Sequence, residues 1–85
     1  MKFKITKVET ISSHSYPGIP KRFFYKGKWW EIETIEDRWY EGGLDPERAL
    51  ILYYKVLSED QLFILRYLPY FQKWQIYQIE DFEIS

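Results

Sequence analysis

The stretch that decides the fold reads Pro20-Lys21-Arg22-Phe23-Phe24-Tyr25-Lys26-Gly27-Lys28-Trp29-Trp30. Two runs rich in aromatic residues flank Gly27, and glycine readily adopts the positive φ of a tight turn. The stretch therefore predicts a β-hairpin in which Arg22–Lys26 pairs with Trp29–Glu36 about a turn at 26–28. Because neighbouring residues of a strand face opposite sides, we expect one of Trp29 and Trp30 in the core and the other outside.

Further strands are predicted on both sides of this hairpin, in runs of β-branched and aromatic residues. They are Lys2–Ile11, Ala49–Leu57, Gln61–Leu68 and Lys73–Ile79, with Asp81–Ile84 as a strand end or a tail. Breaks are predicted at Ser12–Pro20, at Glu41–Pro46 and at a second hairpin turn, Ser58-Glu59-Asp60. Asp45-Pro46 suits the start of a helix, so we expect one short helical turn at most.

Two of these strands are apolar on both faces. Ala49–Leu57 and Gln61–Leu68 carry large apolar residues at both parities, which is typical of strands with both faces covered. A flat sheet of 85 residues cannot cover both of its own faces. It must curl, fold its N-terminal arm over one face, or dimerise.

We therefore predict a mainly β protein: a small curled antiparallel sheet or a partly open barrel of five to six strands. Residues 1–85 are expected to form a single domain, in which 1–19 supply an N-terminal strand and loop and 20–81 form the core β-sheet. The chain has no cysteine, so its stability must come from apolar burial, to which an aromatic content of 21% is well suited. With no signal peptide and no apolar run long enough to span a membrane, we expect a cytoplasmic protein without membrane contact.

The net charge of −1 conceals an uneven distribution. Residues 1–30 carry +6, residues 31–48 carry −5 and residues 49–85 carry −2. This asymmetry has two interpretations. The basic end binds a polyanion, or strands of opposite charge pair across the sheet.

Residue types needed for common catalytic sites are missing. His14 is the only histidine and lies in a loop rich in serine and proline, so neither a Cys–His pair nor a multi-histidine metal site can form within one chain. The Glu-Asp pairs at 36–37, 59–60 and 80–81 are expected to serve turns and solvated edges. No glycine-rich phosphate loop is present. We predict no enzyme, no catalytic, cofactor-binding or metal-binding residues, and no cofactor.

The hairpin carries the candidate contact residues for nucleic acid or a protein partner. They are Lys21, Arg22, Tyr25, Lys26, Lys28, Trp29 and Trp30. Exposed aromatic rings interleaved with cations on a sheet are a common platform for stacking single-stranded bases. The alternative is that these rings form the core and the cross-strand pairs of a small sheet.

The spacing of these residues resembles a small bacterial family of unknown function. The pattern runs Pro20-x-x-Phe23-x-Tyr25-x-Gly27-x-Trp29-Trp30-x-Ile32, then Trp39, Tyr53-Tyr54-x-Val56, Asp60-x-x-Phe63-x-Leu65-x-Tyr67 and Trp74-x-Ile76-x-x-Ile79-x-Asp81. Members of that family stand alone or accompany DNA-repair proteins of the inactive Y-family polymerase type. They commonly carry arginine-rich strands, whereas Glu31, Glu33, Glu36 and Asp37 make this chain acidic there.

Together these observations predict a non-enzymatic interaction module. Its leading function is protein binding or self-association, and the resemblance implies a link to a DNA-repair or replication assembly. The alternative is single-stranded nucleic-acid binding through the basic aromatic hairpin 21–30.

Overall fold

A computed structural model of the chain describes residues 2–11 and 18–80. Its strands are β1 (Lys4–Thr6), β2 (Val8–Ile11), β3 (Ile19–Tyr25), β4 (Lys28–Glu31), β5 (Thr34–Glu41), β6 (Ile51–Ser58), β7 (Gln61–Leu68) and β8 (Lys73–Ile79), with a 3-10 turn η1 (Pro46–Arg48). They form a five-stranded antiparallel sheet of order β1-β8-β7-β6-β5 and a three-stranded antiparallel sheet of order β2-β3-β4. The two sheets do not close into a barrel, and the prediction of a mainly β fold with one short helical turn is confirmed.

The described residues form eight strands where five to six were predicted, because two of the predicted strands bend and serve both sheets. The segment Lys2–Ile11 breaks at Lys7, whose carbonyl oxygen accepts from the Phe24 amide at 2.9 Å. The segment Trp29–Glu36 breaks at Ile32 and Glu33. The Ile32 amide donates to Lys21 in the small sheet at 2.9 Å, and the Glu33 amide donates to Leu57 in the large sheet at 2.8 Å. The apolar positions change parity at both corners, from Phe3 and Ile5 to Val8 and from Trp30 and Ile32 to Ile35. This change marks an interruption in each strand but does not by itself show that a second sheet begins there.

Both predicted hairpins are confirmed, each with a two-residue turn. Lys26 and Gly27 have φ of 50° and 81°, and Glu59 and Asp60 have φ of 51° and 63°. Positive φ at both central residues is the conformation that matches the right-handed twist of the flanking strands. The residues beside each turn belong to the strands, and Tyr25 pairs with Lys28.

Other predicted breaks agree in part. Asp45 caps η1 by accepting from the amides of Glu47 and Arg48, so the predicted helical turn is present. The predicted loop Ser12–Pro20 falls mostly on residues 12–17, outside the described residues, and its last two residues already belong to β3. His14 and the segment Asp81–Ile84 also lie outside the described residues.

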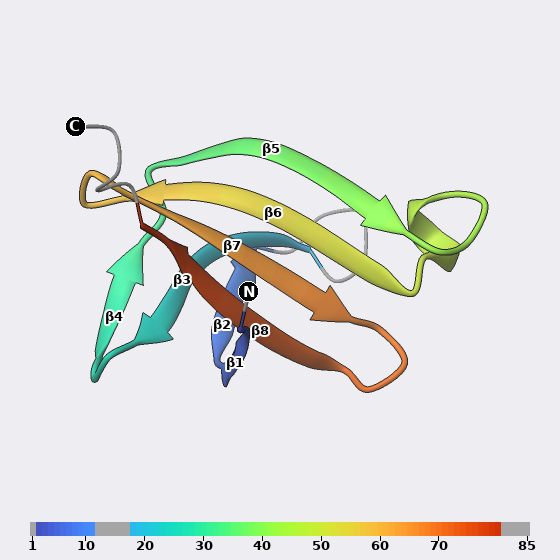
Figure 1. Cartoon of the computed structure of the whole chain (residues 1–85), viewed down its shortest axis with the longest axis horizontal. Helices are drawn as coiled ribbons and strands as arrows, with labels where there is room; N and C mark the ends of the chain where they lie inside the picture. Colours follow the sequence, from blue (N-terminus) through green and yellow to red (C-terminus); the bar gives the residue numbers. More distant parts are fainter. Residues whose placement is uncertain (1, 12–17, 81–85) are drawn as a thin grey trace.

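The core lies between the two sheets (Figure 1). Phe23 of the small sheet and Phe63 of the large one are both fully buried, with ring centroids 4.8 Å apart. Trp30 completes this group edge-on to Phe63 at 5.2 Å. Full burial of each such side chain contributes roughly 1.5–3 kcal/mol. Trp30 is only 7% exposed and Trp29 is 36% exposed, which answers which of the two tryptophans faces outward.

The second face of the large sheet is covered by its own large side chains. Trp39 stacks on Tyr53 with centroids 5.0 Å apart and ring planes 4° from parallel. The guanidinium of Arg66 lies 3.8 Å from the ring centroid of Phe3, which precedes β1. This face is therefore half-buried, although no second sheet packs on it within the described part of the chain.

Candidate basic aromatic cleft

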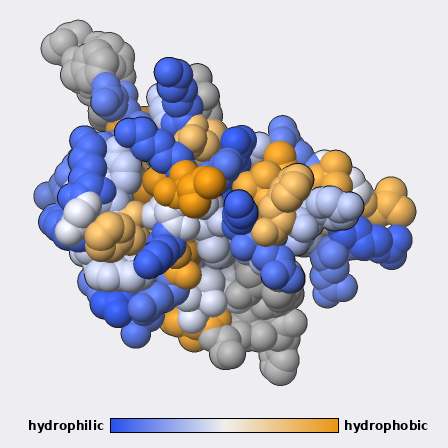
Figure 2. All heavy atoms as spheres, turned by 90° about the horizontal axis from the view of Figure 1, so that it is seen from below, coloured by the Kyte–Doolittle hydropathy of each residue, from blue (hydrophilic) through white to orange (hydrophobic). Residues whose placement is uncertain are grey.

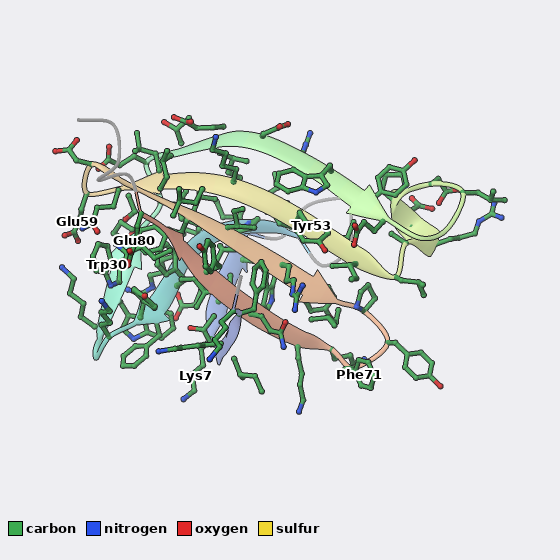
Figure 3. All side chains as sticks on the ribbon, viewed as in Figure 1. Lys7, Trp30, Tyr53, Glu59, Phe71 and Glu80 are labelled. Atoms are coloured by element: carbon green, nitrogen blue, oxygen red, sulfur yellow. The ribbon has the colours of Figure 1, made fainter. Side chains whose placement is uncertain are left out.

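A cleft of about 490 Å³ opens between β1 and the β3–β4 hairpin. It is lined by Lys4, Ile5, Thr6, Lys7, Phe24, Tyr25, Lys26, Trp29 and Ile76. This volume lies within the range of about 300–1,000 Å³ that is usual for ligand pockets. Figure 3 shows Lys7 at the end of the molecule that carries β1 and the hairpin, away from Phe71 in the β7–β8 loop.

Hydrogen bonds fix the two walls of the cleft against each other. The Thr6 hydroxyl donates to the carbonyl oxygen of Phe24, and the Phe24 amide donates to the carbonyl oxygen of Lys7. On its other side β1 pairs with β8, in a register that places Lys4 opposite Ile76. The cleft is therefore a consequence of the bend at Lys7, where the chain leaves the large sheet and joins the small one.

Two aromatic rings present their surfaces at the hairpin wall. Phe24 and Trp29 lie directly opposite each other on β3 and β4, with ring centroids 5.5 Å apart and ring planes at 73°. They are 37% and 36% exposed, so each ring keeps surface for a ligand. The guanidinium of Arg22 lies 4.8 Å from the Trp29 ring centroid and covers part of that ring.

Three exposed lysines surround these rings. Within the described residues, Lys4, Lys7 and Lys26 form no ion pair, and no carboxylate lines the cleft. Lys26 instead lies 5.4 Å from the ring centroid of Tyr25. The cleft thus concentrates positive charge that the described part of the fold leaves unneutralised.

Two of the other hairpin cations, Arg22 and Lys28, are neutralised. Arg22 binds Glu9 at 2.7 Å and Glu31 at 3.5 Å, and Lys28 binds Glu59 at 2.9 Å. The hydrogen bond from Arg22 lowers the pKa of the Glu9 carboxyl, and the same bond raises the pKa of the guanidinium. Ion pairing between distant segments therefore accounts for part of the charge asymmetry. Binding of a polyanion by the basic end stays a prediction.

The structure divides the seven predicted contact residues. Tyr25, Lys26 and Trp29 line the cleft. Trp30 is in the core, where its indole N–H donates to the Tyr25 carbonyl at 2.9 Å, so Trp29 is the member of the pair that remains a candidate contact residue. Lys21, Arg22 and Lys28 lie outside the cleft lining.

Tyr25 contributes mainly to the packing beneath the cleft and less to its exposed surface. It is half-buried, and its hydroxyl donates to Gln78 at 3.2 Å. Its ring packs edge-on against Phe63 with centroids 5.4 Å apart. Tyr25 therefore forms the floor of the cleft and joins it to the core.

Sequence reasoning missed six lining residues, namely Lys4, Ile5, Thr6, Lys7, Phe24 and Ile76. A signal existed in the charge of +6 on residues 1–30, which includes Lys4 and Lys7. That signal could not place the N-terminal strand beside the hairpin, because strand neighbours depend on topology.

The described residues include no group of three or more histidine, cysteine, aspartate or glutamate side chains able to hold a metal ion. None of the helical segments in ranges 2–11 and 18–80 is long and apolar enough to cross a membrane. Comparison of the chain with protein-family models, curated proteins and solved structures finds no match. The family resemblance therefore stays a prediction.

Proposed function

We propose that this protein is a non-enzymatic interaction module that binds single-stranded nucleic acid in the basic aromatic cleft. The observation that carries the proposal is the meeting of three unneutralised lysines with the exposed rings of Phe24 and Trp29 in one cleft. Lysines that contact phosphates release condensed counterions, which drives binding of any sequence. Aromatic rings add about 1–3 kcal/mol for each stacked base and require bases that are free of a duplex.

The cleft changes the order of the two functions that the sequence left open. Sequence alone favoured a protein partner, because two strands are apolar on both faces in a chain too short to cover them. The acidic segment after Trp30 also offered the hairpin cations a counter-charge. The ion pairs of Arg22 and Lys28 use Glu9, Glu31 and Glu59, and they leave the cleft lysines without acidic partners among the described residues. Nucleic acid is therefore the partner whose chemistry the cleft matches best.

Fluorescence anisotropy of a labelled oligothymidylate tests this function. We expect binding at low salt, with an affinity that falls by about 0.7 decade per decade of salt for each phosphate contact. A duplex of equal length should bind more weakly, because its bases cannot stack on Phe24 and Trp29. Absence of binding at low salt, or equal binding of duplex, would contradict the proposal.

Protein binding remains a second candidate because of the opposite end of the molecule. Figure 1 shows the β5–β6 connection and the β7–β8 loop at that end. The large apolar side chains that these segments expose, with their exposed fractions, are Leu44 (80%), Leu50 (63%), Tyr70 (86%) and Phe71 (62%). Exposed apolar side chains gathered at one end are typical of a protein contact. Through the resemblance, such a partner would belong to a DNA-repair or replication assembly. A pull-down experiment tests this candidate. Proteins that are captured equally well by variants lacking these side chains would count against it.

A further inference from the structure

A second groove, of about 560 Å³, lies at the end of the large sheet that extends past the small sheet (Figure 1). It is lined by Arg38, Trp39, Tyr40, Pro46, Leu52, Tyr53 and Tyr54. Strand alternation places Arg38 and Tyr40 of β5 on the same face of the sheet. Their partners across the sheet, Tyr54 and Leu52 of β6, are core residues. The groove therefore continues the core-side face of the large sheet beyond the part that the small sheet covers.

The floor of the groove is made of buried side chains. Leu52 and Tyr54 are each 8% exposed, and the ring of Tyr54 packs against that of Trp74 with centroids 5.7 Å apart. Tyr40 lies opposite Leu52, is 40% exposed and keeps ring surface above this floor. A flat apolar body can pack on this tyrosine ring and on the leucine beside it.

The proline wall of the groove is held in place by the β5–β6 connection. Asp45 caps η1, and the Leu50 amide donates to the carbonyl oxygen of Glu41 at 2.9 Å. Gly43 has a φ of +94° and passes so close to Arg48 that a Cβ there would meet the Arg48 carbonyl oxygen. These contacts make the groove a pre-formed feature of the fold.

The charge of the groove is positive. Arg38 is the one charged side chain in the lining, and it forms no ion pair among the described residues. Two carboxylates of β5, Asp37 and Glu41, belong to the opposite face of the sheet by strand alternation. Asp37 accepts from the backbone amide of Arg38 at 2.8 Å, and Glu41 accepts from the Tyr53 hydroxyl at 2.7 Å. The guanidinium of Arg38 is therefore left to a ligand.

The Tyr54 hydroxyl adds an uncharged donor to this guanidinium. Burial raises the pKa of the Tyr54 phenol, against the opposing effect of the Arg38 charge, so the hydroxyl is protonated near neutral pH. No carboxylate among the described residues lines the groove. Its charged and buried polar groups thus favour a ligand that accepts hydrogen bonds and carries negative charge.

We propose that this groove binds a small molecule that consists of a flat aromatic ring and one carboxylate. The ring packs on Tyr40 and Leu52, and the carboxylate binds Arg38, whose planar guanidinium can donate two parallel hydrogen bonds to it. The volume of the groove lies within the usual range for small-molecule pockets, about 300–1,000 Å³. A single unpaired cation matches a single negative charge, whereas the three lysines of the basic cleft suit a polyanion. The site is separate from that cleft and does not rest on the proposed nucleic-acid function.

Three ligands that share one ring and differ in charge test the proposal. They are indoleacetate, which is negative, indoleacetamide, which is neutral, and tryptamine, which is positive. Each is titrated into the full chain, and amide chemical shifts report both the affinity and the place of binding. We expect indoleacetate to shift residues of β5, η1 and β6, and to bind about tenfold or more tightly than indoleacetamide, because hydrogen bonds to charged groups are the stronger ones. Tryptamine should bind most weakly.

Two substitutions separate the contributions of charge and ring. Arg38→Gln should remove the preference for indoleacetate over indoleacetamide and leave the affinity for indoleacetamide unchanged. Arg48→Gln is the matched control, since Arg48 is exposed, paired with Asp45 and outside the lining, and it should preserve the preference. Tyr40→Ala should weaken indoleacetate and indoleacetamide by the same factor, about three- to tenfold, because both lose the same ring contact.

Equal binding of indoleacetate and tryptamine would overturn the proposal, and so would a preference for indoleacetate that survives Arg38→Gln. Absence of shifts in the groove at millimolar indoleacetate, or shifts confined to the basic cleft, would also overturn it. Replacement of Lys4, Lys7 and Lys26 by glutamine should leave indoleacetate binding unchanged, and Arg38→Gln should leave oligothymidylate binding unchanged. These two results keep failure of this proposal distinct from failure of the nucleic-acid proposal.

Discussion

The basic cleft and the β5–β6 end of the large sheet both carry aromatic rings on adjacent antiparallel strands, and they differ in how charge is placed around those rings. The cleft gathers three lysines without carboxylate partners in the described part of the chain. At the β5–β6 end the charges are mixed: residues 36–48 carry five carboxylates and two arginines, and Arg48 is paired with Asp45. The difference shows that similar aromatic residues occur at both ends, and that ion pairing within the fold decides how much charge each end leaves unneutralised. Figure 2, which views the molecule from below, shows hydrophobic residues in orange interspersed with hydrophilic residues in blue over that face of the molecule.

The largest effect is expected from Phe63→Ala, which removes the ring that joins the two sheets. Phe63 packs against Phe23, Tyr25 and Trp30, so its loss should lower the free energy of unfolding by about 3–5 kcal/mol. Urea denaturation measures this, and hydrogen exchange should quicken more in β3 and β4 than in β5. Phe71→Ala is the control. Phe71 is 62% exposed, and a change beyond about 0.5 kcal/mol there would contradict the assignment of the core.

Removing the positive charge of the cleft tests the electrostatic contribution to nucleic-acid binding. Replacement of Lys4, Lys7 and Lys26 together by glutamine should cost about a hundredfold in oligothymidylate affinity at about 0.1 M salt, if each lysine neutralises one phosphate. The slope of log affinity against log salt should become shallower by about 2. Lys55→Gln, on the opposite face of the large sheet, should change neither quantity. An unchanged slope in the triple variant would show that the cleft does not bind phosphates.

Removing one tryptophan at each end compares the aromatic contributions of the two regions. Trp29→Ala should weaken oligothymidylate binding by about 1–3 kcal/mol, the usual contribution of one stacked base. Trp39→Ala removes a ring of similar exposure from the second face of the large sheet, where it stacks on Tyr53, and should leave this binding unchanged. Anisotropy measures both variants. Equal losses would mean that the two regions bind one ligand.

A smaller effect is expected from glycine substitutions at the two turns that shape these regions. Gly27 has a φ of +81° and open space around it, so Gly27→Ala should cost about 1 kcal/mol from the left-handed backbone alone. Gly43→Ala should cost more, because its Cβ would meet the Arg48 carbonyl oxygen. Thermal unfolding compares the two. A larger cost at Gly27 would show that the β5–β6 connection is looser than the contacts of Gly43 indicate.

The smallest effect is expected at the ion pair between Arg22 and Glu9. Because the folded pKa of Glu9 is lowered by Arg22, this pair stabilises the fold above the unfolded pKa, and its contribution is lost as pH falls through the folded value. NMR titration of the Glu9 carboxyl should give a pKa below its ordinary value in wild type and a higher one in Arg22→Gln. Identical pKa values of Glu9 in the two proteins would mean that Arg22 does not pair with Glu9 in solution. The charge of Arg22 would then add to that of the cleft.

Local sequence rules predicted the elements well and the candidate site only in part. The turn at Lys26-Gly27, the capped turn at Asp45-Pro46 and the alternation of Phe23 with Phe24 follow from backbone preferences and period-two burial. Those rules act over a few residues. They could not show that Lys7 joins two sheets, because hydrogen bonds to two different strands define that corner.

The sequence by itself determined a mainly β chain with two tight hairpins, an aromatic core and one inward-facing tryptophan of the pair Trp29-Trp30. Only the tertiary structure decided that Lys4 and Lys7 lie beside Trp29 and that Glu59 neutralises Lys28. The physical reason is the distance along the chain over which each kind of interaction acts. Turn and strand propensities depend on neighbouring residues, whereas the charge of a surface depends on which distant strands the topology brings within ion-pairing distance.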